Sequence, residues 1–351
     1  MNLRPHKKDG RRITRLWHSN APGPVLTRTL LAPLAWTFAG AVRVRNALYD
    51  RGLLRSAPAA IPVVSVGNLS VGGTGKTPLA AFLSMRLKAA GAQPALVMRG
   101  VGGDESRAYA VLAPGVPVVA DADRVRGVQT AAARGADIAV LDDAFQHRRI
   151  RREADIVVIS ADAPDIRPRL LPSGPQREPL GSLRRADLVV IVRKAASRER
   201  VERVRELVLE RFPGLAIVEV WLAPAGLVNW SSGARRELET MREQRVVAVA
   251  GIGNPDAFFS QLATHSRHLE RIPFRDHHAF TERDAAFIAD CAAGFDAVVC
   301  TLKDAVKLGP IWPRQAPELW YVSQRLDVEE GESHLERMLA RLLDLRHSYR
   351  Q

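Results

Sequence analysis

The sequence predicts an α/β protein with a doubly wound, mostly parallel sheet and a second, smaller α/β domain. Short apolar runs rich in β-branched residues alternate with segments of helical composition, which is typical of parallel sheets covered by helices. The 351 residues are enough for two domains at roughly 100–200 residues each. A composition of 46% hydrophobic and 25% charged residues indicates a folded globular core.

The first half of the chain alternates strands with helices. Six apolar runs are short and are bounded by turn-forming or charged residues, which indicates buried strands. They span residues 61–66, 93–98, 116–120, 137–141, 156–159 and 188–192. Helices are expected at residues 78–90, 125–134 and 195–210.

A second α/β pattern follows a short connecting region. Residues 216–222 form a possible linker strand, and the stretch that continues to Arg245 is polar. Further strands are expected from Val246 onward, at 298–301 and at 320–323, and a final helix is expected at 329–346. We therefore predict a first domain at 1–210 and a second at 211–351.

The formal net charge of +13 favours acidic partners, namely nucleic acid, anionic lipid headgroups or phosphorylated substrates. The two cysteines, Cys291 and Cys300, lack the spacing of a metal site or a disulfide framework, which suggests a reducing compartment. The sequence contains no recognisable helix-turn-helix, zinc or aromatic-basic module, so we expect no nucleic-acid partner.

Basic residues cluster around an apolar run near the N-terminus. The run spans 30–42, about 13 residues, whereas a membrane-spanning helix needs ~20. The basic residues before and after it are Arg4, Lys7, Lys8, Arg11, Arg12, Arg15, Arg43, Arg45 and Arg51. The pattern favours a helix at 25–48 that lies in an anionic membrane surface, kinked or restarted at Pro33. A helix buried against the domain is the alternative. A cleaved signal peptide is rejected, because export would separate the glycine-rich segment that follows from its ligand.

A glycine-rich segment lies between the first expected strand and helix. Its residues are Ser70, Val71, Gly72, Gly73, Thr74, Gly75, Lys76 and Thr77. Glycines let backbone N–H groups turn toward phosphate oxygens, and the start of a helix favours an anion. Lys76 can bridge the β- and γ-phosphates of a nucleotide, and the Thr77 hydroxyl can bind magnesium. The segment is therefore predicted to be a phosphate-binding loop (P-loop), although Ser70 stands where the usual pattern has glycine.

A metal-bound nucleotide also needs an acidic residue at the end of a neighbouring strand. Asp142 and Asp143 come directly after the expected strand at 137–141. The sequence thus predicts binding of a nucleoside triphosphate with Mg²⁺, and it leaves the acceptor open.

Further motifs follow in order along both halves of the chain. They are Val66-Gly67-Asn68, Gly72 to Pro78, Arg99-Gly100, Pro117 to Arg124, Asp142 to His147, Leu170 to Pro175, Arg177-Glu178-Pro179, Ala250 to Pro255 with Phe258-Phe259, Asp276-His277 and Thr301 to Lys307. This ordered set, over residues 30–325, resembles the tetraacyldisaccharide 4'-kinase family. Members of that family phosphorylate the lipid A disaccharide precursor at the bacterial inner membrane.

The resemblance implies an ATP- and Mg²⁺-dependent kinase whose active site lies in a cleft between two α/β domains joined by a small β linker. It also implies an N-terminal membrane-associating helix and a location at the cytoplasmic face of the inner membrane. The matching residues would bind Mg²⁺ through Thr77 and Asp142, completed by Glu105 or Asp143. Asp104 would accept the proton of the sugar 4'-hydroxyl, which His277 would polarise. Arg124 and Arg177 are either phosphate contacts or structural ion pairs.

The chain departs from the family pattern at two places. Val101 and Ser106 replace a tyrosine and a proline, and residues 99–102 run directly into Gly103, which indicates a deletion before Asp104. A Gly-Asn-Gly motif is absent near residues 165–167. These departures concern lipid contacts and turnover more than nucleotide binding. Three alternatives stay open: another P-loop ATPase or GTPase, a basic nucleic-acid-binding protein that uses ATP, and a membrane-bound relative whose kinase chemistry has decayed.

Overall fold

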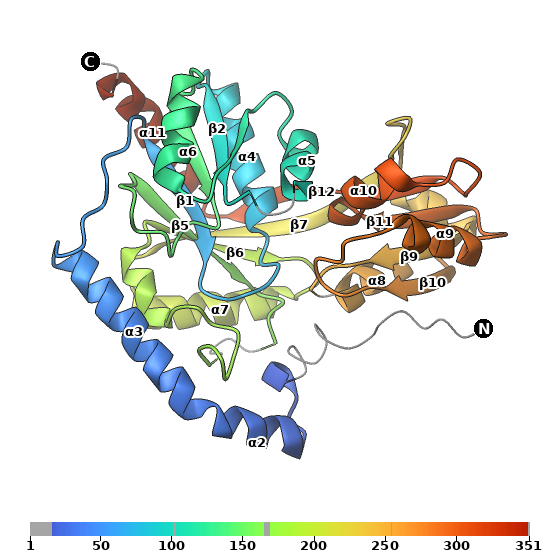
Figure 1. Cartoon of the computed structure of the whole chain (residues 1–351), viewed down its shortest axis with the longest axis horizontal. Helices are drawn as coiled ribbons and strands as arrows, with labels where there is room; N and C mark the ends of the chain where they lie inside the picture. The colour runs from blue at the N-terminus through green and yellow to red at the C-terminus, as the bar shows by residue number, and fades with distance from the viewer. Residues whose placement is uncertain (1–15, 101–102, 165–168, 254, 350–351) are drawn as a thin grey trace. The chain divides into compact units, whose positions relative to one another are not determined.

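The computed structural model describes residues 16–100, 103–164, 169–253 and 255–349, which form two compact units (Figure 1). The nucleotide unit comprises residues 16–222 and 326–349 of this part, and the second unit comprises residues 223–325. The C-terminal helix α11 therefore belongs to the nucleotide unit. The predicted domains at 1–210 and 211–351 stay a prediction, because a compact unit need not be an independently folding domain.

The sheet of the nucleotide unit is parallel, with the strand order β3-β2-β4-β1-β5-β6-β7. Its strands are β1 (Val63–Asn68), β2 (Pro94–Met98), β3 (Val118–Ala120), β4 (Ile138–Asp142), β5 (Ala154–Ser160), β6 (Leu188–Arg193) and the first part of β7 (Ala216–Asn229). The central strand β1 pairs with β4 in a register that sets Val66 opposite Asp142. Ligands of such sheets bind at the carboxyl ends of the strands, where the strand order reverses. The loop after β1 and the acidic end of β4 therefore lie side by side.

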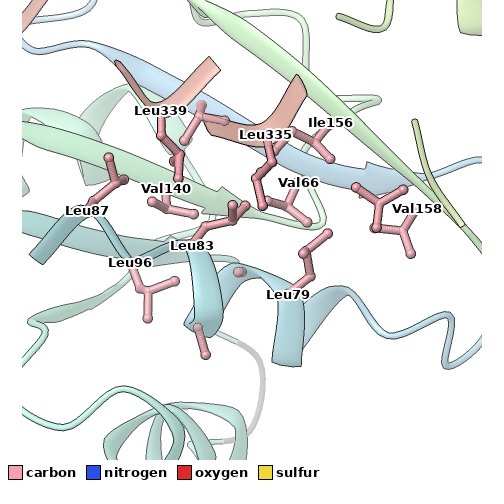
Figure 2. Close-up of a cluster of buried hydrophobic side chains, with 14 of the residues drawn as sticks. Val66, Leu79, Leu83, Leu87, Leu96, Val140, Ile156, Val158, Leu335 and Leu339 are labelled. Atoms are coloured by element: carbon pink, nitrogen blue, oxygen red, sulfur yellow. The ribbon is translucent and has the colours of Figure 1, made fainter. Parts of the chain in front are cut away.

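Helices cover both faces of this sheet, as the alternation of side chains along each strand requires. The helices of the nucleotide unit that follow β1 are α4 (Lys76–Ala89), α5 (Asp104–Leu112), α6 (Arg124–Ala133), the 3₁₀ helix η1 (Leu180–Arg185), α7 (Arg198–Arg211) and α11 (Glu332–Ser348). Figure 2 shows one face, where Leu83 of α4 and Leu335 of α11 lie with Val140 of β4. On the opposite face Val128 of α6 packs in a cluster with Leu141 of β4.

The second unit is a smaller α/β layer structure. Its elements are the rest of β7, β8 (Arg235–Arg236), η2 (Leu238–Glu243), β9 (Arg245–Ala250), α8 (Pro255–Ala263), β10 (His268–Pro273), α9 (Glu282–Cys291), β11 (Ala297–Thr301), α10 (Leu302–Leu308), η3 (Gly309–Ile311) and the first part of β12 (Leu319–Glu330). Strands β10, β9, β11 and β12 pair in parallel in that order. The expectation of two α/β patterns in one chain is confirmed.

The N-terminal segment forms two helices, α2 (Pro22–Leu30) and α3 (Ala32–Asp50), which bend by 48° at the break. The prediction of one helix at 25–48 is therefore corrected, and its expected restart falls at Leu31 with Pro33 in the first turn of α3. Within the described residues no single helix is long and apolar enough to span a membrane, but the bent pair meets those criteria together. The predicted basic cluster at residues 4–15 lies outside the described residues.

One face of α3 is fixed to the nucleotide unit through the carboxylate of Glu178. This side chain is 1% exposed, and it accepts hydrogen bonds from Asn46 Nδ2 at 3.0 Å, Arg185 Nη2 at 2.6 Å and Arg45 Nη2 at 3.3 Å. Such a buried carboxylate is stable only when charged and polar partners surround it. Residues 170–178 in turn contact the P-loop, because Val71 N donates to Pro175 O at 2.8 Å.

Candidate active site

The P-loop follows β1 directly and ends at the first turn of α4. Gly72 and Gly75 have φ values of 120° and 98°, which residues other than glycine rarely adopt. A Cβ placed on Gly72 or Gly73 would meet no atom within 4 Å, so the loop leaves open space over its backbone. Inside the loop, Asn68 Nδ2 donates to Thr74 Oγ1 at 3.1 Å. The predicted residues 70–77 thus form an open, glycine-shaped cradle at a helix N-terminus, as a phosphate group requires.

Lys76, the first residue of α4, lies 3.5 Å from Asp143, measured from Nζ to Oδ1. Arg177 Nη1 donates to both oxygens of the same carboxylate, at 3.1 and 2.9 Å. Burial alone would raise the pKa of Asp143, but the positive charges of Lys76 and Arg177 outweigh it and lower that pKa. Asp143 has a φ of 51°, which turns it out of the strand direction of β4. It is therefore an ionised group between two cations at the loop.

The second residue of α4, Thr77, lies close to the last residue of β4, Asp142. Thr77 Oγ1 lies 3.5 Å from Asp142 Oδ2, and both residues are less than 10% exposed. The same oxygen accepts a hydrogen bond of 2.6 Å from the hydroxyl of Tyr109 on α5. Burial and the charge of Asp142 raise the pKa of Tyr109 well above its ordinary value. The hydroxyl is therefore a permanent donor to the carboxylate.

These groups fit Mg²⁺ and a nucleotide. Mg²⁺ takes oxygen ligands at 2.0–2.1 Å in an octahedron, so that neighbouring ligands lie about 3 Å apart, close to the Thr77–Asp142 separation. Within the part of the chain that the structure describes, no group of three or more His, Cys, Asp and Glu residues forms a metal site by itself. Nucleotide-bound Mg²⁺ is generally held by few protein groups together with phosphate oxygens and water, so the Thr77–Asp142 pair is compatible with it.

Asp104 and Glu105 form the first turn of α5, after Gly103 with a φ of 69°. Glu105 precedes Tyr109 by four residues, so both side chains lie on one side of the helix. The charge of Glu105 contributes to the raised pKa of Tyr109. The structure thus brings this turn of α5 to the same end of the sheet as Asp142. Val101, Gly102 and residues 165–167, where the chain departs from the family pattern, lie outside the described residues.

The two candidate arginines differ in their surroundings. Arg124 is 3% exposed and donates to the backbone oxygens of Asp121 at 2.8 Å and Asp142 at 3.4 Å. Burial lowers its pKa, although the Asp142 charge opposes this. Arg177 is more accessible and forms the ion pair with Asp143. Arg124 therefore supports the end of β4, while Arg177 is the arginine with a side-chain ion pair at the loop.

His277, the predicted second catalytic residue, belongs to the second unit. It has a φ of 55°, its side chain is 67% exposed, and its backbone N–H donates to Asp276 Oδ1 at 3.1 Å. Its neighbour His278 is different, since its Nε2 lies 3.1 Å from Asp284 and its ring packs on Phe274. Of the two histidines, His277 is the accessible one. The catalytic roles of His277 and Asp104 stay predictions.

Two contacts at the loop were not foreseen from the sequence. Tyr109 was missed because the apolar residues of this segment form one continuous run, 108–112, which lacks the spacing of an amphipathic helix. Lys194, at the end of β6, was also missed; its Nζ lies 3.1 Å from Gly73 O. The available signal for Lys194 was its position directly after a strand of the same parallel sheet, at the carboxyl edge where ligands bind.

The sheet is parallel, and a glycine-rich loop follows its central strand β1. Lys76 and Thr77 begin the next helix, and Asp142 ends the neighbouring strand β4. Together these features define the class of P-loop nucleotide-binding proteins. The family model described as tetraacyldisaccharide-1-P 4'-kinase matches residues 27–344. The chain therefore belongs to the tetraacyldisaccharide-1-P 4'-kinase family, and the resemblance in the sequence is confirmed.

Relatives agree with this assignment over nearly the whole chain. The tetraacyldisaccharide 4'-kinase of Anaeromyxobacter sp. (strain Fw109-5) is 40% identical, with 93% of this chain and 95% of the relative covered. The enzyme of the same name from Syntrophus aciditrophicus (strain SB) is 34% identical over 92% of this chain and 96% of its own. The crystal structure of "apo" form LpxK from Aquifex aeolicus in complex with ATP has a TM-score of 0.72 and 28% identity, covering 90% of this chain and 99% of that one.

Proposed function

We infer that this chain is an ATP-dependent kinase that transfers the γ-phosphate to the 4'-hydroxyl of tetraacyldisaccharide 1-phosphate in lipid A biosynthesis. The observation that carries the inference is the family match over residues 27–344, together with an intact P-loop site inside it. Several relatives at 34–40% identity bear the name of this activity. No observation favours another P-loop ATPase or GTPase.

The nucleotide half of the reaction rests on the P-loop. Backbone N–H groups of residues 72–77 and the N-terminus of α4 would hold the phosphates, and Lys76 would leave Asp143 to contact the β- and γ-phosphates. Thr77 and Asp142 would hold Mg²⁺, with Glu105 or Asp143 completing its surroundings. The ion, when bound, neutralises the charge that develops on the phosphate oxygens. These contacts orient the γ-phosphate and supply electrostatic stabilisation.

The acceptor half rests on Asp104. In this proposal the 4'-hydroxyl oxygen attacks the γ-phosphorus while its proton passes to the Asp104 carboxylate. The bond between the γ-phosphorus and the β,γ-bridging oxygen breaks, and ADP leaves. His277 would polarise the hydroxyl as a donor or acceptor, for which its exposed ring is suited. Asp104 lies at the first turn of α5, next to Glu105, which supports a role close to the metal.

The lipid half rests on α2 and α3, which we propose as the membrane contact at the cytoplasmic face of the inner membrane. The pair exposes large apolar side chains: Leu26 (61%), Leu30 (71%), Leu34 (58%) and Trp36 (73%). A soluble surface rarely groups such side chains without a partner. Arg43 and Arg51 lie on or directly after the same helix, where anionic phosphates would attract them. The alternative of a fully buried helix does not agree with these exposed fractions.

The test is transfer of labelled phosphate from [γ-³²P]ATP to tetraacyldisaccharide 1-phosphate in detergent micelles. Lys76→Ala is the blank, and Lys88→Ala, an exposed lysine near the other end of α4, is the matched lysine control. We expect labelled lipid with the wild type and the control and a loss of at least ~10²-fold with Lys76→Ala. ATP binding without any labelled lipid from the wild type would overturn the proposal and favour a relative with decayed activity.

A further inference from the structure

Tyr109 is a fully buried side chain that reaches a predicted metal ligand, Asp142. Its exposed fraction is 0%, and its ring lies in the hydrophobic cluster that includes Leu79 and Leu83 of α4. The hydroxyl is the only polar atom of that side chain. It is directed out of the cluster to Asp142 Oδ2 at 2.6 Å.

The hydroxyl competes for the same carboxylate oxygen that faces Thr77. Thr77 Oγ1 lies 3.5 Å from Asp142 Oδ2, whereas Tyr109 donates at 2.6 Å. A hydrogen bond from a neutral donor to a carboxylate is short and strong, and it fixes the rotation of the carboxylate plane. Groups that orient metal-binding carboxylates in this way typically contribute 10- to 100-fold to metal affinity or activity.

Tyr109 also joins two parts of the site that the backbone does not connect directly. Its helix α5 begins with Asp104 and Glu105, while Asp142 ends β4. The ring is packed against α4, whose first residues are Lys76 and Thr77. The Tyr109 side chain therefore packs on the helix that begins with Lys76 and donates to Asp142 of β4. Its own helix α5 carries Asp104, the predicted base.

We propose that Tyr109 is a positioning residue for metal-bound nucleotide: its hydroxyl holds the Asp142 carboxylate in the orientation in which it faces Thr77. The proposal rests on the inferred kinase function only for the identity of the ligand, Mg²⁺ with ATP. It assigns Tyr109 no contact with the substrate. A structural role alone would affect folding stability, whereas a positioning role also changes the Mg²⁺ requirement.

The experiment measures ATP binding by calorimetry in EDTA and then at increasing Mg²⁺, for the wild type, Tyr109→Phe and Tyr349→Phe. Tyr349 is the matched control, because its hydroxyl also donates to a carboxylate at 2.6 Å, that of Glu153, away from the loop. We expect Tyr109→Phe to bind ATP normally in EDTA and to need 10- to 100-fold more Mg²⁺ for the metal-dependent gain in affinity. Tyr349→Phe should keep the wild-type Mg²⁺ requirement.

A wild-type Mg²⁺ requirement in Tyr109→Phe would overturn the proposal. So would an equal loss of ATP affinity with and without Mg²⁺, since that result indicates a general packing defect. Tyr109→Met, whose flexible side chain fills the space without a donor, replaces Tyr109→Phe if the latter does not fold. This binding measurement needs no lipid acceptor. A failure of the lipid kinase assay would therefore contradict the proposed function without deciding the role of Tyr109.

Discussion

The Nζ of Lys76 lies 3.5 Å from Oδ1 of Asp143, and Arg177 donates to both oxygens of the same carboxylate. The lysine that the P-loop provides for phosphate is thus paired with the acidic residue that follows the neighbouring strand β4. Binding of a nucleotide would exchange this carboxylate for phosphate oxygens. The ion pair therefore holds the lysine Nζ beside the loop.

The ion pairs of Asp143 make a prediction about stability against pH. Lys76 and Arg177 lower its pKa below the ordinary value of 3.8, despite the opposing effect of burial. A group with a lowered folded pKa adds stability that is complete above the unfolded pKa and is lost as the pH falls through the folded one. Since the side chain is 39% exposed, we expect Asp143→Asn to lower the free energy of unfolding by ~1 kcal/mol or less at pH 7.

Urea unfolding between pH 7 and pH 3 measures this difference. The gap between the wild type and Asp143→Asn should stay constant down to about pH 5 and then shrink. Asp50→Asn is the control, because Asp50 forms an ion pair of similar exposure with Arg148 away from the loop. A gap that grows on acidification would contradict the lowered pKa of Asp143.

Asp104 is expected to accept the proton of the attacking hydroxyl. Asp104→Asn should lower kcat by ~10²–10⁴-fold and change the KM for ATP little, because the loss falls on proton transfer and not on nucleotide binding. Asp290→Asn, an exposed carboxylate on α9, is the control and should keep full turnover. Wild-type kcat in Asp104→Asn would remove Asp104 from the mechanism.

His277 and His278 offer a paired test in the second unit. His277 is 67% exposed, so His277→Ala should leave the melting temperature within a few degrees of the wild type and should lower kcat. His278 packs on Phe274 and lies 3.1 Å from Asp284, so His278→Ala should lower the melting temperature by more than His277→Ala. Equal kcat values for His277→Ala and the wild type would contradict its assignment.

The strands around the P-loop were predictable, because continuous apolar runs such as 138–141 and 188–192 are buried on both faces of a parallel sheet. The loop itself was predictable from its glycines and their place after a strand. Helix α5 was not, since only Ala108 and Tyr109 of its residues are buried. The Tyr109–Asp142 contact joins a helix to a strand across intervening chain, and local propensity carries no information about it.

The hydrogen bond from Asn46 of α3 to Glu178 makes a prediction about how much this contact stabilises the packing of α3. Asn46→Ala removes a hydrogen bond to a buried charge and should lower the free energy of unfolding by ~1.5–3 kcal/mol. It should also speed proteolytic cleavage within residues 16–50, because local opening of α3 becomes easier. Thr37→Ala is the control, since Thr37 is an exposed residue of α3 whose hydroxyl donates to Leu34 O within the same helix. Unchanged unfolding and cleavage would show that Glu178 does not hold α3.

The exposed side chains of α2 and α3 make a last prediction, about membrane binding. Full burial of a large apolar side chain contributes ~1.5–3 kcal/mol, and each 1.4 kcal/mol is a factor of ten. Leu30 and Trp36 are 71% and 73% exposed, so replacing both by serine should weaken binding to vesicles of anionic phospholipid by at least ~10-fold. Val111→Ser, on α5, is the matched control and should bind as the wild type does.

Co-sedimentation with vesicles at low and high salt separates the apolar from the charged contribution. Replacing Arg43 and Arg51 by glutamine should reduce binding to anionic vesicles mainly at low salt, because each basic group near such a surface contributes ~1 kcal/mol and salt screens it. The serine variant should be defective at both salt concentrations, since apolar burial is not screened. If both variants bound anionic vesicles as tightly as the wild type, the α2–α3 surface would not be the membrane contact.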